Sequence, residues 1–246
     1  MSYYGRYSGF APYVSVGEKK VRAARMLAKL RKKNKDISPI ILTGSKIAVT
    51  WWGLSWNKNL ERYADYEYRL DRGKSYVRHG SVLDLKISEG NIAALVQGSG
   101  RSPYKVSIDI KEINKKNWQN IKIMCEGKID SLAELLEGSF PKELEALFFE
   151  KGLGLFPSPK EIIFKCSCLD WASMCKHVAA VLYGVGAKLD SNPSLFFELR
   201  NIDMKGLISH AVAEKKQKLL KKSVKKSKRV MKNADIGKVF GIDLKK

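Results

Sequence analysis

Long apolar runs are missing from this 246-residue sequence. No segment approaches the ~20 consecutive apolar residues that a membrane-spanning helix requires. The segment from Met1 to Gly17 is rich in aromatic residues and glycine and has no apolar signal core, so we expect no secretion. These absences lead us to expect a cytoplasmic protein with no membrane partner.

Cysteine and histidine are scarce, with four and three residues respectively. Four cysteines in a chain of this length do not form the dense disulfide framework of small secreted domains. A Walker-type Gly-Lys-Thr/Ser loop is also missing, which excludes a P-loop ATPase. The sequence shows neither the paired carboxylates nor the histidine motif of a nuclease. We therefore expect no enzymatic activity.

Acidic residues are outnumbered, with 25 Asp and Glu against 46 Lys and Arg, for a net charge of +21. Residues 18–36 carry +7 and residues 211–246 carry +10, whereas residues 37–210 carry only +3. Basic extensions bind polyanions by releasing condensed counterions, which indicates a nucleic-acid partner, DNA more than RNA. The alternatives are a solvated, solubilising tail and an anionic membrane surface.

Two stretches of the body add candidate nucleic-acid contacts. In residues 66–79 tyrosines alternate with basic residues, a pattern that suits base stacking together with phosphate contact. The glycine loop at 98–103 is either a backbone nest for a phosphate or a plain strand connector. The candidate nucleic-acid residues are Arg72, Lys74, Arg78, Arg101, Lys221, Lys222, Lys225 and Lys226.

The hydrophobic pattern predicts an α+β fold. Alternation over 82–87, 92–96 and 104–110 predicts an antiparallel meander of three strands. We expect a further strand over 47–52 and a helix over 54–65, with Trp51, Trp52 and Trp56 in the core rather than stacked on bases. Further helices are expected over 18–36, 118–125, 193–199 and 202–213, with short ones beginning at 131 and 141.

We divide the chain into four parts: a basic N-terminal arm or helix (1–44), an α+β domain (45–160), a zinc finger with following helices (161–210), and a basic tail (211–246) that is helical or disordered.

One short segment carries recognisable chemistry, because three of the four cysteines and one histidine fall within twelve residues: Cys166, Cys168, Cys175 and His177. On a β-strand Cys166 and Cys168 would face the same side. Residues two apart on a helix point about 200° apart, so we place Cys175 before a helix and His177 in its first turn. Three thiolates and an imidazole complete a tetrahedral set for Zn²⁺, so we predict a structural site.

Other roles for these cysteines fit less well. A Cys-x-Cys pair bridges poorly as a disulfide. A Cys175–His177 nucleophilic pair lacks the spatial geometry that such catalysis needs. Cys125 lies about forty residues away and is expected to be a buried free thiol. Lys165 and Lys176 flank the thiolates and are expected to offset the −1 charge of a zinc-loaded site.

The pattern Cys-x-Cys, six residues, Cys-x-His resembles the SWIM zinc finger, and Cys-Ser-Cys-x-Asp-Trp with Cys-Lys-His resembles its stand-alone prokaryotic members. A looser resemblance extends over about 45–205. It implies a small ββα-like zinc unit, used for DNA binding or protein–protein contact, and no particular activity. Our leading hypothesis is a zinc protein that binds nucleic acid. The alternative is an adaptor for a Swi2/Snf2-type helicase or another nucleic-acid enzyme.

Overall fold

The protein was analysed as a computed structural model, which describes residues 14–62, 67–125, 128–129, 132–139, 141–170, 172, 174–209, 212–213, 216 and 220. Its elements in chain order are α1 (Val16–Lys33), α2 (Trp51–Glu61), α3 (Glu67–Arg78), β1 (Val82–Ser88), β2 (Asn91–Val96), β3 (Tyr104–Ile110), α4 (Lys115–Cys125), α5 (Leu132–Glu137), α6 (Lys142–Phe148), a 3-10 turn (Pro159–Glu161), β4 (Ile162–Cys166), α7 (Lys176–Ser191) and α8 (Ser194–Leu199). Residues 204–209 are also helical. The predicted α+β class is confirmed.

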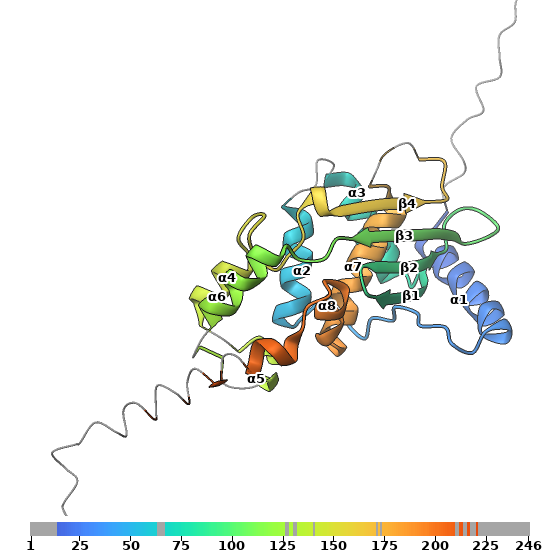
Figure 1. Cartoon of the computed structure of the whole chain (residues 1–246). Helices are drawn as coiled ribbons and strands as arrows, with labels where there is room; N and C mark the ends of the chain where they lie inside the picture. Colours follow the sequence, from blue (N-terminus) through green and yellow to red (C-terminus); the bar gives the residue numbers. More distant parts are fainter. Residues whose placement is uncertain are drawn as a thin grey trace, which may run out of the picture.

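The four strands form one antiparallel sheet in the order β1-β2-β3-β4 (Figure 1). The predicted meander is β1 to β3, and β4 pairs with β3 so that Cys166 lies opposite Val106. β4 falls within the predicted finger, whereas its partner β3 precedes residue 161. The ββα arrangement around the cysteines therefore consists of β3, β4 and α7.

Helices cover one face of this sheet. α7 packs against all four strands, and α2 and α3 pack against α7 (Figure 1). The alternating burial along β3 follows from this arrangement, since Val106, Ile108 and Ile110 are its buried residues and lie on the face that the helices cover. α3 and α7 approach each other so closely at Gly73 that a side chain would not fit there, because a Cβ on Gly73 would lie 2.7 Å from the Cβ of Ala179.

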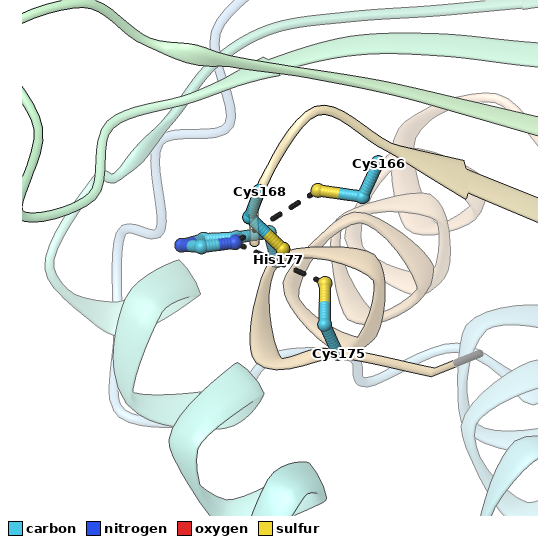
Figure 2. Close-up of side chains that lie close together, drawn as sticks. All are labelled: Cys166, Cys168, Cys175 and His177. Carbon is cyan, nitrogen blue, oxygen red and sulfur yellow. Dashed lines mark hydrogen bonds between the residues drawn. The ribbon is translucent and has the colours of Figure 1, made fainter. Parts of the chain in front are cut away.

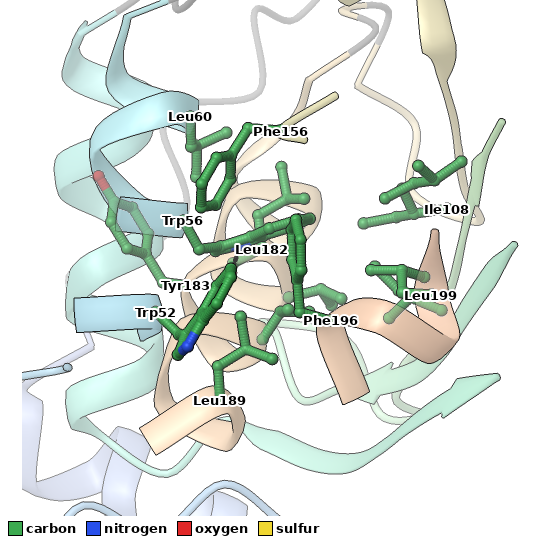
Figure 3. Packing of buried hydrophobic residues seen from close by; sticks show 14 of the residues in the cluster. Trp52, Trp56, Leu60, Ile108, Phe156, Leu182, Tyr183, Leu189, Phe196 and Leu199 are labelled. Carbon is green, nitrogen blue, oxygen red and sulfur yellow. Dashed lines mark hydrogen bonds between the residues drawn. The ribbon is translucent and has the colours of Figure 1, made fainter. Parts of the chain in front are cut away.

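The aromatic core lies between α2, α7 and α8 (Figure 3). The ring of Trp52 lies 5.2 Å from that of Phe196, and its indole Nε1 donates to the carbonyl of Leu135 at 2.9 Å. The indole Nε1 of Trp56 donates to the carbonyl of Leu182 at 2.8 Å. The prediction that the tryptophans are core residues is confirmed for these two, which are buried, while Trp51 is half-buried against the same cluster.

The strand predicted over 47–52 is wrong. Residues 47–50 are irregular and Trp51 begins α2, which ends at Glu61 rather than at 65. Thr50 caps the helix, and both its backbone N–H and its hydroxyl donate to the carboxylate of Asp190, which comes 140 residues later. β-Branched and aromatic residues favour a strand locally, but this contact with α7 fixes Thr50 as a helix N-cap.

The other predicted helices compare with the structure as follows. α1, α4, α6 and α8 form near the expected positions, and the predicted 202–213 helix is seen over 204–209 and 212–213. The expected capping residue at 131 and the tail residues Lys221, Lys222, Lys225 and Lys226 lie outside the described residues. None of the helices in the described part of the chain combines the length and apolarity that a bilayer span requires.

Candidate metal centre

β4 supplies the first two cysteines. Cys166 is the last residue of the strand, and Cys168 lies in the bend that follows, so the two do not share a strand as predicted. Ser167, between them, makes two hydrogen bonds with Lys105 of β3: its backbone N–H donates to the Lys105 carbonyl at 3.0 Å, and its hydroxyl accepts from the Lys105 N–H at 2.9 Å. These two hydrogen bonds end the pairing of β3 with β4, and the chain then turns toward α7.

The N-terminus of α7 supplies the other two side chains. Cys175 is the extended N-cap residue, with φ −78° and ψ 169°, and His177 lies in the first turn. This is the arrangement that the spacing predicts. Both residues are buried, whereas Cys166 and Cys168 are half-buried. The backbone of Ala179 donates to the Cys175 carbonyl at 3.0 Å and so fixes the helix start.

The four side chains converge on one point (Figure 2). Their ligand atoms all lie within 4.8 Å of one another. Nδ1 of His177 lies 3.9 Å from Sγ of Cys166 and 3.8 Å from Sγ of Cys175. Bond lengths of about 2.3 Å to sulfur and 2.0–2.1 Å to nitrogen place tetrahedral zinc ligands about 3.6–3.8 Å apart. This Cys3His group could therefore hold a metal ion after a small contraction, with Nδ1 as the imidazole ligand.

The thiols strongly perturb one another. A hydrogen bond from Cys166 is the main cause that lowers the pKa of Cys175 to about 3, assisted by His177 and by the first-turn amide of Val178, while burial opposes the shift. The same contact and burial raise the pKa of Cys166. Like charges this close cannot all form unaided, so only a bound cation lets three thiolates coexist here. The donor set thus fits a thiophilic metal ion.

Three neighbours enclose the imidazole of His177. The ring of Tyr104 stacks on it with centroids 4.3 Å apart, and the ring of Tyr76 meets it nearly edge-on at 5.4 Å. Gly98 lies against its far edge: a Cβ there would come 2.9 Å from Nε2 and 2.5 Å from the Tyr104 ring. Nε2 is buried without a hydrogen-bond partner among the described residues. The ring is therefore held by packing, with Nδ1 turned to the sulfurs.

An ion pair ties the loop after Cys168 to α3. Nη1 of Arg69 lies 2.7 Å from Oδ2 of Asp170, and the two side chains are 8% and 21% exposed. Oδ1 of the same carboxylate accepts from the backbone N–H of Ala172 at 3.2 Å. Asp170 thus anchors the knuckle between Cys168 and Cys175. Spacing alone does not reveal this pair, although Asp170 belongs to the Cys-Ser-Cys-x-Asp-Trp pattern.

Two other expectations concern the charges and thiols near the centre. Lys165 does not offset the charge of the cluster as expected, because its Nζ binds Oδ2 of Asp109 at 2.9 Å on the other side of β4. Arg69 is the main cause that lowers the pKa of Asp170, and the charge of Lys176 adds to it, so Lys176 acts on this carboxyl. Cys125 is a buried free thiol as predicted, and burial raises its pKa to about 12.

The described candidates for nucleic-acid contact do not form one group. Lys74 is bound to Glu61 at 2.9 Å and lies over the ring of Tyr183. Arg72 and Arg101 are exposed. Arg78 is also exposed, and its charge acts on His79 together with the charges of Lys19 and Lys20 from α1. The structure thus joins Arg78, but not Lys74, to the basic N-terminal helix.

Comparisons with known proteins add one relative. No family model matches the chain, and no solved structure matches it. An uncharacterized protein of Mycobacterium tuberculosis, Rv2102, is 35% identical over 172 residues. The match covers 70% of this chain and 62% of that relative, so the chain spans less than two thirds of the relative's length. The relative carries no functional description that bears on the site.

Proposed function

We propose that the chain is a SWIM-type zinc protein, in which Cys166, Cys168, Cys175 and His177 hold a structural Zn²⁺ and basic extensions bind nucleic acid, DNA more than RNA. The observation that carries the proposal is the convergence of four ligand atoms within 4.8 Å from a strand end, a bend and a helix N-terminus. A zinc ion there would fasten β4 to α7, the helix on which the sheet packs.

The donor set favours zinc in a structural role. Thiolate-rich tetrahedral sites select Zn²⁺ over magnesium or calcium, which prefer oxygen ligands. Catalytic zinc sites keep one position for water, whereas here four protein side chains complete the coordination. The stacking of Tyr104 and the packing of Gly98 close the histidine side of the site. We therefore assign the cluster no catalytic role.

The exposed face of α1 supports nucleic-acid binding. Ala23 is its buried residue, and Met26, Leu27 and Leu30 are half-buried. Basic side chains are exposed at Lys20, Arg25, Lys29, Arg31, Lys32 and Lys33, and Arg22, also exposed, donates to the carbonyl of Ser99. A cationic surface of this kind attracts a phosphate backbone without reading its sequence. The C-terminal stretch 211–246 would add its +10 to the same partner.

A salt titration of duplex and single-stranded DNA binding tests this function. Neutralising two phosphate contacts should reduce the slope of log K against log salt by about 1.8. We expect this for the double variant Arg25→Gln/Lys29→Gln on α1. The matched control is Lys115→Gln/Lys116→Gln on α4, which removes the same charge from exposed residues at the opposite end of the molecule (Figure 1).

The outcomes separate nucleic-acid binding from the adaptor role. Deletion of 211–246 should weaken binding further, since it removes thirteen basic residues. Absence of binding at low salt, or equal slopes for the α1 and α4 variants, would overturn nucleic-acid binding through the extensions. Co-purification of a stoichiometric protein partner after nuclease treatment would then support the adaptor role.

A further inference from the structure

A small cavity lies between α1, the end of α3 and the glycine loop that connects β2 to β3. Its volume is about 50 Å³, and its lining includes Lys19, Arg22, His79, Ser81 and Ser99. A cavity needs about 10–15 Å³ to hold one water molecule, so this one has room for a tetrahedral anion but not for a nucleoside.

The cavity is electropositive. None of the described residues that line it is acidic. Burial, assisted by the charges of Lys20, Lys19 and Arg78, holds the pKa of His79 below its ordinary value, which favours the neutral ring. Lys19 and His79 are half-buried, whereas Arg22 is exposed at the rim. A phosphate would meet the cationic side chains of Lys19 and Arg22 there, both of which belong to α1.

The hydroxyl of Ser81 lies at the floor of the cavity and is available for a hydrogen bond to a ligand. Ser81 is only 5% exposed, and its hydroxyl makes no hydrogen bond to any described residue. Its backbone groups are satisfied, since its N–H donates to the Tyr76 carbonyl and its C=O accepts from the Gln97 N–H. Ser81 lines the cavity, so its hydroxyl can donate to an acceptor bound there.

The glycine loop is held with its carbonyl oxygens engaged. Nε2 of Gln97 donates to the carbonyls of Gly98 at 3.0 Å and Gly100 at 2.9 Å, and Nη1 of Arg22 donates to the carbonyl of Ser99 at 3.0 Å. These bonds reduce the negative potential that free carbonyls would present to an anion. Between the described residues, the amides of Ser99 and Gly100 donate to no acceptor.

The cavity shares its wall with the metal centre. Tyr76 and Gly98 line the cavity, and both also contact the imidazole of His177. The cavity thus lies where the basic helix α1 meets the body of the chain.

We propose that this cavity is a binding site for a single phosphate group, in which Arg22 and Lys19 supply cationic donors, His79 supplies an imidazole N–H and Ser81 supplies a hydroxyl from the floor. The proposal goes beyond nucleic-acid binding by the extensions, because it requires only one phosphate. The phosphate belongs either to a nucleic acid, as a terminal group or a backbone diester, or to free phosphate in solution.

An NMR titration of the zinc-loaded full chain with inorganic phosphate tests the site. The chain has three histidines, so the Cε1–Hε1 signal of His79 can be assigned by its loss in His79→Gln. We expect a saturable shift of this signal with phosphate and none with chloride at equal ionic strength. Arg22→Gln and Ser81→Ala should each weaken binding about tenfold, as expected for one hydrogen bond to a charged group.

Arg31→Gln is the matched control, since it removes one charge from the exposed last turn of α1, away from the cavity. It should leave phosphate affinity unchanged. An unmoved His79 signal, or equal affinities for Arg22→Gln, Ser81→Ala and the control, would overturn the site. Ser81→Ala removes only a hydroxyl, so it tests the site even if Arg22→Gln disturbs the loop.

Short thymidine oligomers with and without a 5′-phosphate distinguish the source of the phosphate. Tighter binding of the phosphorylated oligomer, lost in Ser81→Ala, identifies a terminal phosphate. Equal binding of both, weakened alike in Ser81→Ala, identifies a backbone diester. If inorganic phosphate binds the cavity and neither oligomer competes with it, the ligand is free phosphate. A further outcome is oligomer binding that depends on salt and yet is the same in wild type, Arg22→Gln and Ser81→Ala. That result would overturn the cavity site but would agree with nucleic-acid binding by the extensions.

Discussion

The aromatic ring of Tyr104 lies on the imidazole of His177, with the ring centroids 4.3 Å apart and the planes inclined by 30°. Tyr104 begins β3 and His177 lies in the first turn of α7, so this contact joins the meander to the metal-ligating helix. It leaves Nδ1 facing the sulfurs of Cys166 and Cys175 and places Nε2 against Gly98. The orientation of the ligand thus depends on Gly98 and Tyr104, which lie more than seventy positions earlier in the sequence.

Gly98→Ala should damage the metal centre. The new methyl group would lie 2.5 Å from the ring of Tyr104 and 2.9 Å from Nε2 of His177, so the ligand must move. We expect a loss of about 1–3 kcal/mol in stability from overpacking, and zinc affinity about 10–100-fold lower. Competition with a chromophoric chelator measures the affinity.

Gly100→Ala is the control for that variant. A Cβ on Gly100 would have its nearest contact at 3.4 Å, the hydroxyl of Tyr104, which is ordinary packing. The two alanine variants add the same methyl group to the same loop. Equal zinc affinity for both would show that Gly98 does not position His177.

Asp170→Asn should loosen the knuckle between Cys168 and Cys175. The substitution takes a carboxylate away from the buried guanidinium of Arg69, which it binds at 2.7 Å. We expect a cost of about 1–3 kcal/mol in urea unfolding and faster zinc release. Asp109→Asn disrupts the more exposed pair with Lys165 and should cost less than about 1 kcal/mol. Equal losses would contradict the anchoring role of Asp170.

Glu161→Gln should lower stability at neutral pH by about 1–3 kcal/mol, because Oε1 of Glu161 binds the guanidinium of Arg200, which is 1% exposed, at 2.9 Å. Burial acts to raise the pKa of Glu161, but hydrogen bonds from Ser158 and the charge of Arg200 outweigh it, and the pKa lies below its usual value. The stabilisation is therefore present above the unfolded pKa of about 4.3 and disappears as the pH falls through the folded value.

Unfolding free energies of wild type and Glu161→Gln, measured from pH 7 down to pH 3, check this dependence. The difference between the two proteins should shrink through the acidic range. The exposed Glu112 gives the control, and Glu112→Gln should remain close to wild type throughout. A constant difference between wild type and Glu161→Gln would show that the ionised carboxylate is not the source of the stabilisation.

The sequence predicts the local parts of this structure well. The meander follows from the alternation of residues in β1 to β3 and from the turn at Gly90, which has φ +67°. The Cys175–His177 geometry follows from helical periodicity alone. Both depend on neighbours within a few residues, and both are confirmed.

The features that the sequence analysis predicted wrongly or missed depend on contacts between residues that are distant in the sequence. Thr50 begins a helix because Asp190 binds it, so its strand-forming neighbours mislead a local interpretation. β4 joins the meander across more than fifty residues. The approach of Gly98 to His177 likewise has no local signature. Nonlocal pairing of this kind cannot be deduced from periodicity, since each partner looks ordinary in its own segment.

The metal content of the purified chain tests the central claim most directly. Elemental analysis of protein expressed in zinc-containing medium should give about one zinc per chain, and a strong chelator should unfold the region around α7, because metal binding energy here is folding energy. Cys125→Ala, at the buried thiol outside the cluster, should retain the zinc, and Cys168→Ser should lose it. A fully folded chain without zinc, or full zinc content in Cys168→Ser, would contradict the account.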